Sequence, residues 1–510
     1  MRIRALFGLI LCLLTAGAQP TTAPASRRLP LITREDLATA YIRAERAVRD
    51  HPPRDPRTRA AAHRAMDRAA YQFFTADHSG AIRTMNELAD ALRLGREIAV
   101  GADQQPHPTT GPARPPDVRS VVNAIRVRVS PRVANIHRPS IFNVRLSSLY
   151  PIEIARPIDL RLLVREDKPG GKVVFEQALQ LRSDAALPSV SAKQPAAEPG
   201  RYRVVLTGKA GEEIDVAKWY VVDRSLDVQR AANERRLFEV KQDNFRQFQA
   251  LVACRGRNAL LTDRPTEVES SQFLIDPTTL LPEVSAEVEA LRKGEDPYAG
   301  RLGDYWRAIP CGAMQVPSRV YVPKQANAGQ PMPLVIVLHG AGGDENAWFD
   351  ATGAGEIKRL ADRHGFIVVA PNTYWVLPNP NALKGIVETM SVDYSIDTTR
   401  VYVIGHSLGA MAAAGMATRA PDGLAGAVLI AGGTIPPKTA ICPTLLVAAE
   451  LDPIFPPHKL ERAAAEAKEA GLPVEFKLMR ESGHALVAGE VLPEAVEWLM
   501  KHQLETKRKD

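Results

Sequence analysis

Short apolar runs that alternate with stretches of helical composition occupy the last two-fifths of this 510-residue chain. Among them are LVIVLH at 334–339, FIVVA at 366–370, VYVI at 401–404 and LLVAA at 445–449. Strands that are apolar throughout are buried on both faces, and their alternation with helices is typical of a parallel sheet covered on both sides. The sequence therefore predicts an α/β domain over residues 297–505.

The first 19 residues have the pattern of a secretory signal peptide. Arg2 and Arg4 precede an apolar stretch at 5–14, and small residues at 16–18 suit cleavage. The apolar stretch is shorter than the roughly 20 residues that span a bilayer. We therefore expect an exported protein, periplasmic or extracellular, with no membrane span after signal removal.

Four regions are expected between the signal peptide and the α/β domain. Residues 20–100 carry apolar residues at helical spacing, and residues 101–117 form a linker rich in Pro, Gly and Thr. Residues 118–225 alternate apolar and polar residues between turns, which predicts a small immunoglobulin-like β-sandwich. Residues 226–296, rich in Arg, Glu and Gln, form a second helical region.

Charge and cysteine content narrow the choice of partners. The chain has 65 Lys and Arg against 58 Asp and Glu, and no long basic block with interleaved aromatic residues, so we expect no nucleic-acid partner. Beyond the signal peptide lie Cys254, Cys311 and Cys442, whose spacing fits no metal site. One disulfide bond is compatible with the sequence, which does not choose the pair.

Ser407 lies in GHSLG at 405–409, between the strand VYVI and the helical stretch LGAMAAAGMATRA. A serine at this point either caps the helix or stands at a tight strand-to-helix turn that exposes its hydroxyl as a nucleophile. The turn requires glycine at positions 405 and 409, because the backbone there packs too closely for a Cβ atom. The partners of the serine must decide between the two readings.

A nucleophilic serine needs a base, and the base needs a carboxylate to orient it. Asp452 follows the strand LLVAA, and His484 follows the strand VEFKLM at 474–479. The chain order is then nucleophile, acid and base, each in a loop after a later strand. The sequence therefore predicts Ser407, Asp452 and His484 as the catalytic residues.

Three other residues compete for these roles. Glu450 is the alternative acid, but Asp452 lies better within the loop, just before the turn at Pro453. His458 is expected on the following helix, and His406 is expected to point along the turn beside the serine. We therefore prefer Asp452 and His484.

An oxyanion hole is predicted from HGAGG at 339–343, which directly follows an early strand. Glycines there allow backbone N–H groups to approach a tetrahedral intermediate, together with the N–H that follows the nucleophile. We assign these donors to Ala341 and Leu408, with Gly342 as the alternative to Ala341. The loop lacks the spacing of a phosphate-binding loop.

Together, HGAGG, GHSLG, Asp452 in ELDP and His484 in SGHA resemble the α/β-hydrolase superfamily. Within it they resemble secreted esterases of the feruloyl esterase and polyhydroxybutyrate depolymerase type. The resemblance covers the last two-fifths of the chain and implies an α/β-hydrolase fold and ester hydrolysis through an acyl-enzyme, without metal or organic cofactor. Prolyl-oligopeptidase-like peptidases share these motifs, and an exported binding protein with a vestigial hydrolase domain is a second alternative.

The sequence gives weaker indications of the substrate. The segment at 431–443 leaves no room for a lid after the nucleophile, so we expect an open site suited to bulky or polymeric esters of polysaccharide or polyester type. Tyr374 and Trp375 either line a substrate pocket or anchor a loop by packing. Trp348 and Phe349 are expected in the core.

Overall fold

The computed structural model describes residues 32–98, 123–151, 154, 156–182, 187–265, 274–436 and 439–505. The predicted signal peptide and the predicted linker lie outside the described residues.

An eight-stranded mixed sheet forms the centre of the C-terminal domain, in the order β16-β15-β14-β13-β11-β12-β10-β9. The strands from β16 to β12 in this order are parallel, whereas β10 pairs antiparallel with both β12 and β9. The strands are β9 (Gly303–Cys311), β10 (Met314–Val322), β11 (Met332–Leu338), β12 (Ile367–Pro371), β13 (Ile396–His406), β14 (Gly426–Ile430), β15 (Thr444–Ala449) and β16 (Val474–Met479). Every residue of β11, β12, β14 and β15 is buried, which confirms the inference from the continuous apolar runs.

Helices cover both faces of this sheet. The core on one face includes α12 (Ala382–Asp393), α13 (Leu408–Arg419) and α14 (Pro457–Glu469). The core on the other face includes α10 (Glu356–His364) and α15 (Val487–Leu499). The predicted α/β class, a mostly parallel sheet flanked by helices, is confirmed.

A β-sandwich precedes this domain. Its smaller sheet contains β1 (Ile125–Ser130), β3 (Ile141–Ser148) and β6 (Ser189–Lys193). Its larger sheet, in the order β2-β8-β7-β4-β5, contains β2 (Val133–Asn135), β4 (Ile158–Glu166), β5 (Val173–Leu181), β7 (Gly200–Gly208) and β8 (Glu213–Val222). Phe142 and Trp219 meet edge to face in its core, with ring centroids 5.1 Å apart. The immunoglobulin-like relationship of this sandwich stays a prediction.

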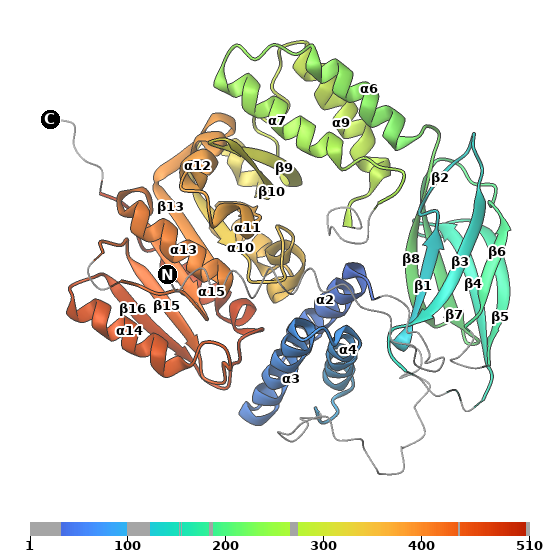
Figure 1. Cartoon of the computed structure of the whole chain (residues 1–510), viewed down its shortest axis with the longest axis horizontal. Helices are drawn as coiled ribbons and strands as arrows, with labels where there is room; N and C mark the ends of the chain where they lie inside the picture. The colour runs from blue at the N-terminus through green and yellow to red at the C-terminus, as the bar shows by residue number, and fades with distance from the viewer. Residues whose placement is uncertain are drawn as a thin grey trace, which may run out of the picture.

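Two groups of helices complete the described chain (Figure 1). Helices α6 (Leu226–Phe238), α7 (Phe245–Ala259) and α9 (Pro277–Arg292) share a core with the C-terminal sheet, and α7 packs on β9. Helices α2 (Arg34–Asp50), α3 (Pro56–Phe74) and α4 (His78–Leu94) lie between the sandwich and the C-terminal domain. Their core continues into the sandwich and also includes Ala485 and Leu486 of the C-terminal domain.

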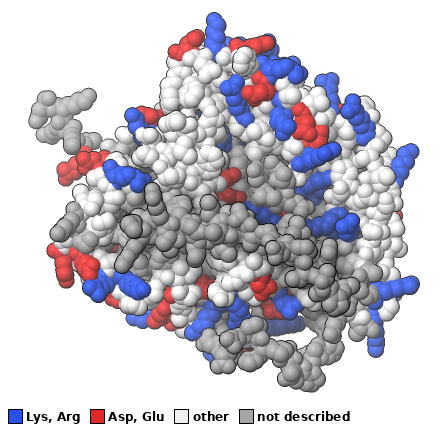
Figure 2. Space-filling view, in the orientation of Figure 1, with Lys and Arg blue, Asp and Glu red and all other residues white. Residues whose placement is uncertain are grey.

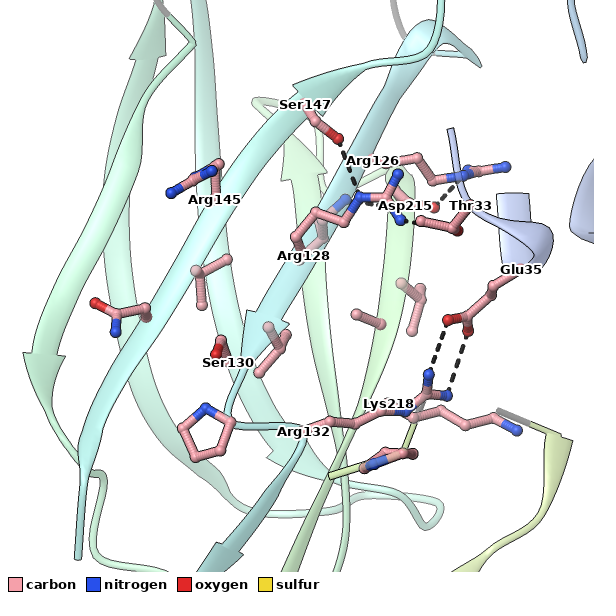
Figure 3. A pocket seen from close by; sticks show the side chains of 18 of the residues that line it. Thr33, Glu35, Arg126, Arg128, Ser130, Arg132, Arg145, Ser147, Asp215 and Lys218 are labelled. Atoms are coloured by element: carbon pink, nitrogen blue, oxygen red, sulfur yellow. Dashed lines mark hydrogen bonds and ion pairs between the residues drawn. The ribbon is translucent and has the colours of Figure 1, made fainter. Parts of the chain in front are cut away.

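Ion pairs hold α2 to the sandwich around a hollow of about 940 Å³ (Figure 3). Glu35 pairs with Arg132 at 2.8 Å, and Asp36 pairs with Arg128 at 2.5 Å. Asp36 is buried and also closes a capping box with Thr33 at the start of α2. These contacts fix the helix that faces the C-terminal domain on its other side.

The surface of the described residues carries charges of both signs. On the face shown in Figure 2, Lys and Arg side chains are scattered with Asp and Glu among them. The absence of a nucleic-acid partner stays a prediction. No helix in the described part of the chain has the length and apolar character needed to cross a membrane.

Candidate active site

Ser407 stands at the turn between β13 and α13, with φ 55° and ψ −116°. Such positive φ values are strained for residues other than glycine and cluster at functional sites. The Ser407 N–H donates to the Ile430 carbonyl at 2.9 Å, and the side chain makes no capping hydrogen bond. Ser407 therefore occupies the N-cap position of α13, but its hydroxyl does not cap the helix.

Glycines allow the backbone to close around this turn. A Cβ atom on Gly405 would lie 2.1 Å from the Gly409 carbonyl oxygen, and one on Gly409 would lie 2.1 Å from the Leu338 carbonyl oxygen. A Cβ atom on Gly340 would meet the Ser407 Cβ at 3.3 Å. The expected need for glycine at 405 and 409 is confirmed.

The structure brings Ser407, His484 and Asp452 into one hydrogen-bonded chain. The Ser407 Oγ lies 3.0 Å from His484 Nε2, and His484 Nδ1 lies 2.8 Å from Asp452 Oδ2. The other Asp452 oxygen accepts the N–H groups of Ile454 and Phe455 at 2.8 and 2.9 Å. Since the carboxylate can only accept, His484 carries its hydrogen on Nδ1 and presents the Nε2 lone pair to the serine hydroxyl.

Two of the three competing residues, Glu450 and His458, lie away from Ser407. Glu450 contacts Arg480 at 2.8 Å and accepts the Glu481 N–H at 2.8 Å. His458 is exposed on α14. His484 is the base that contacts Ser407, and Asp452 is the carboxylate that contacts His484.

Two histidines, the buried His339 and the half-buried His406, hold the loops around Ser407, and neither was predicted to have this role. Burial and then the neighbouring His484 lower the pKa of His406 to about 3, and its Nε2 lies 2.9 Å from the His484 carbonyl oxygen. Burial lowers the pKa of His339 to about 4. The His339 Nε2 accepts the Thr373 N–H at 2.9 Å, and its Nδ1 lies 2.9 Å from the Gly340 carbonyl oxygen. Both rings are therefore neutral at pH 7 and each donates to a carbonyl.

The loop predicted to form the oxyanion hole lies next to Ser407. Among the described residues, the N–H groups of Ala341 and Leu408 have no acceptor within the protein. The Gly342 N–H, by contrast, donates to the Tyr374 hydroxyl at 2.8 Å. This difference favours Ala341 over Gly342 as an oxyanion donor.

The predicted aromatic residues fall into two groups. Trp348 and Phe349 are 1 % exposed, so the expectation that they belong to the core is confirmed. Tyr374 and Trp375 lie on the short helix α11 (Thr373–Val376) and are each 44 % exposed. Neither is among the residues that line the cavity beside Ser407. Their predicted contact with substrate stays untested.

The expectation of an open site stays a prediction. A cavity of about 460 Å³ leads to Ser407 and His484, and α2 and α3 form its opposite wall. The segment after the nucleophile is short, and the first helices of the chain contribute part of the cavity lining. The apolar residues of α2 and α3 do not indicate, from sequence alone, that these helices contact loops of the C-terminal domain.

No group of three or more His, Cys, Asp or Glu within the described ranges could hold a metal ion. Cys254, Cys311 and Cys442 are buried and free of disulfide bonds. The disulfide that the sequence left open therefore does not form between any two of them.

Comparison with known proteins finds relatives of a part of the chain. The chain is 33 % identical to feruloyl esterase B of Thermothelomyces thermophilus over 119 residues, which cover 20 % of this chain and 39 % of the relative. It is 34 % identical to poly(3-hydroxyalkanoate) depolymerase C of Paucimonas lemoignei over 137 residues, which cover 23 % of this chain and 32 % of the relative. The chain thus spans about a third of the length of these curated relatives. No family model matches.

Among solved structures, S-formylglutathione hydrolase from Staphylococcus aureus aligns with a TM-score of 0.33 and 15 % identity, over 39 % of this chain and 98 % of that one. The sequence relatives show that a part of the chain is similar to esterases, and the fold and motifs described above resemble those of α/β-hydrolase serine esterases. The resemblance to the feruloyl esterase and depolymerase type, predicted from the motifs, is confirmed.

Proposed function

We propose that the protein is an exported serine esterase that cleaves carboxylic esters through an acyl-enzyme. Ser407 is the nucleophile, His484 the general base and Asp452 the carboxylate that orients His484. The observation that carries the proposal is the hydrogen-bonded chain from Ser407 Oγ through His484 to Asp452, with distances of 3.0 and 2.8 Å. The export predicted from residues 1–19 is part of the proposal.

In the first half of the reaction, Ser407 Oγ attacks the ester carbonyl carbon and its proton passes to His484 Nε2. The negative charge that develops on the carbonyl oxygen is stabilised by the N–H groups of Ala341 and Leu408. Removing one such donor costs about 10²–10³ in kcat in comparable enzymes. The intermediate then collapses, the alcohol leaves with the proton from His484, and the acyl group stays on Ser407.

In the second half, His484 removes a proton from a water molecule that attacks the acyl-enzyme carbonyl. The second tetrahedral intermediate releases the carboxylic acid, and the proton returns to Ser407. Asp452 keeps the Nδ1 hydrogen in place and stabilises the imidazolium that forms in both halves. Each step uses side chains and backbone of this chain and one water molecule.

The test combines a serine-reactive fluorophosphonate probe with a panel of acetyl, longer acyl, feruloyl and hydroxybutyrate esters. Esters on polysaccharide or polyester stay within the proposal and belong in the panel. Wild type should be labelled and active, whereas Ser407→Ala and His484→Ala should lose both properties. Labelling of Ser407→Ala at the wild-type level would overturn the proposal, and faster cleavage of amides than of matched esters would favour the peptidase alternative.

A further inference from the structure

The cavity beside Ser407 is built from two separate parts of the chain. The C-terminal domain supplies the reactive side, with Ser407, His484 and the loop at 339–344. Helices α2 and α3 supply the opposite wall, whose side chains are mostly apolar. They include Leu37, Ile42, Met66, Ala70, Phe73 and Phe74. A volume of about 460 Å³ lies within the range of small-molecule binding sites.

The polar groups on this wall are engaged in holding the helices to the domain. Arg34 pairs with Asp344 at 3.1 Å and donates to the Gly342 carbonyl at 3.1 Å. The Tyr41 hydroxyl donates to the Ala485 carbonyl at 3.5 Å. A sugar ring in the cavity would lose hydrogen bonds to water without equal replacement, whereas an alkyl or aromatic group would lose none.

The wall also reaches the oxyanion loop. A Cβ atom on Gly342 would lie 2.9 Å from Phe73 Cε1, so the Phe73 ring rests against the loop that faces the reacting carbonyl. We propose that this cavity binds an apolar group of the ester, an alkyl chain or an aromatic ring, and that α2 and α3 thereby select the substrate. The proposal rests on the esterase function proposed above.

Two ester series test it and identify which side of the ester enters the cavity. One series is p-nitrophenyl esters from acetate to decanoate, and the other is alkyl acetates from methyl to octyl. Burial of each methylene should raise kcat/KM about three- to fourfold until the cavity is full. A rise in the acyl series supports the proposal with the acyl group as occupant, and a rise in the alcohol series supports it with the alcohol. The absence of a rise in both series overturns it.

A pair of neighbouring substitutions tests the role of the helix. Ala70→Leu narrows the cavity. The ratio of kcat/KM for p-nitrophenyl octanoate to kcat/KM for p-nitrophenyl acetate should therefore fall at least fivefold. Tyr71→Leu is the matched control, because Tyr71 is 70 % exposed and does not line the cavity. Equal ratios in Ala70→Leu and wild type would overturn the proposal. Equal fluorophosphonate labelling of wild type and Ser407→Ala would instead overturn the esterase function itself.

A second inference rests on a different observation, the hydrogen bonds between α3 and the loop that carries His484. The two Asp67 oxygens accept the N–H groups of His484 and Ala485 at 3.1 and 2.8 Å. The preceding Gly483 N–H donates to Nδ1 of the buried His63 at 2.9 Å. A Cβ atom on Gly483 would lie 2.1 Å from Asp67 Oδ2, so loop and helix are in close contact.

We infer that Asp67 is a positioning residue for the proposed base. Its carboxylate holds the backbone of residues 484 and 485 and so sets the distance from His484 Nε2 to Ser407 Oγ. Small errors in such a distance are costly, because a shift of about 1 Å can lower the rate about 100-fold. A residue outside the C-terminal domain would thus control the geometry of the proton transfer.

The test is Asp67→Ala against Glu87→Ala, an exposed carboxylate on α4. Asp67→Ala should lower kcat for p-nitrophenyl acetate about 10- to 100-fold with KM within twofold, and should slow phosphonylation of Ser407 by a small fluorophosphonate equally. Asp67→Asn keeps one accepting oxygen and should give an intermediate kcat. If Asp67→Ala does not fold, Asp67→Asn carries the test. A wild-type kcat in the variant that folds would overturn the inference, while an active Ser407→Ala would overturn the esterase function.

Discussion

At the scale of single residues, His339 and His406 are neutral side chains with carbonyl partners on the loops of the candidate site. Their pKa values, lowered by burial to about 4 and about 3, lie below the ordinary value of about 6.5. Below pH 6.5 the unfolded chain binds protons that the folded protein does not. The free energy of unfolding therefore falls as the pH is lowered, by up to about 1.4 kcal/mol per pH unit for each histidine.

Urea unfolding of wild type and His339→Gln between pH 7 and pH 4.5 measures this contribution. Burial raises the pKa of Glu45 to about 8, which acts in the opposite direction in the same pH window, so the comparison between variant and wild type is the informative quantity. The variant should lose less stability per pH unit than wild type. Identical slopes would contradict the prediction.

Two glycines of α13 differ in what a methyl group would meet. In Gly409→Ala the new atom would lie 2.1 Å from the Leu338 carbonyl oxygen, which is backbone and cannot rotate away. We expect a loss of about 1–3 kcal/mol in the free energy of unfolding, with loss of esterase activity. In Gly415→Ala the new atom meets Arg419 Nη1 at 3.0 Å, the end of a flexible side chain. In that control, the free energy of unfolding should stay unchanged or rise by up to about 1 kcal/mol. Urea unfolding of both variants measures the difference.

At the scale of elements, the loop after β15 carries two carboxylates with different partners. Asp452 contacts His484, whereas Glu450 contacts Arg480. Asp452→Asn should therefore lower kcat by about 10⁴, because an amide at this position favours the wrong tautomer of His484. The kcat of Glu450→Gln should stay within a few-fold of the wild-type value. Steady-state ester hydrolysis separates them, and a comparable loss in Glu450→Gln would contradict the assignment of the acid.

A contact could be predicted from the sequence only where a pattern in the surrounding residues indicates it. Ser407, Asp452 and His484 follow β13, β15 and β16 of one sheet, so the chain order and the glycines were enough to nominate them together. Asp67 follows no such rule, because it contacts a loop 417 positions away. Apolar residues on α3 have the same helical spacing whether they face their own core or a cavity. The contribution of α2 and α3 to the cavity beside Ser407 could therefore not be predicted from the sequences of these helices alone.

At the scale of the whole molecule, one cavity connects α2, α3 and the C-terminal domain. Phosphonylation of Ser407 by a probe with an octyl chain should raise the hydrogen-exchange protection of residues 34–74, because the chain fills the space against these helices. A probe with a methyl group should protect only the surroundings of Ser407. Mass spectrometry of the exchanged peptides measures both, and equal protection of residues 34–74 by the two probes would contradict the prediction.

The contact between Asp67 and the His484 loop also has a consequence for the order of biosynthesis. A ribosome that adds about 5–20 residues per second needs roughly 20 to 80 s to make the 417 positions between the two residues. During that time α3 exists without the loop that it holds, and for the last 77 positions Ser407 exists without His484. In the esterase proposed above, ester cleavage therefore begins only after the loop that carries His484 has been synthesised and has folded against α3.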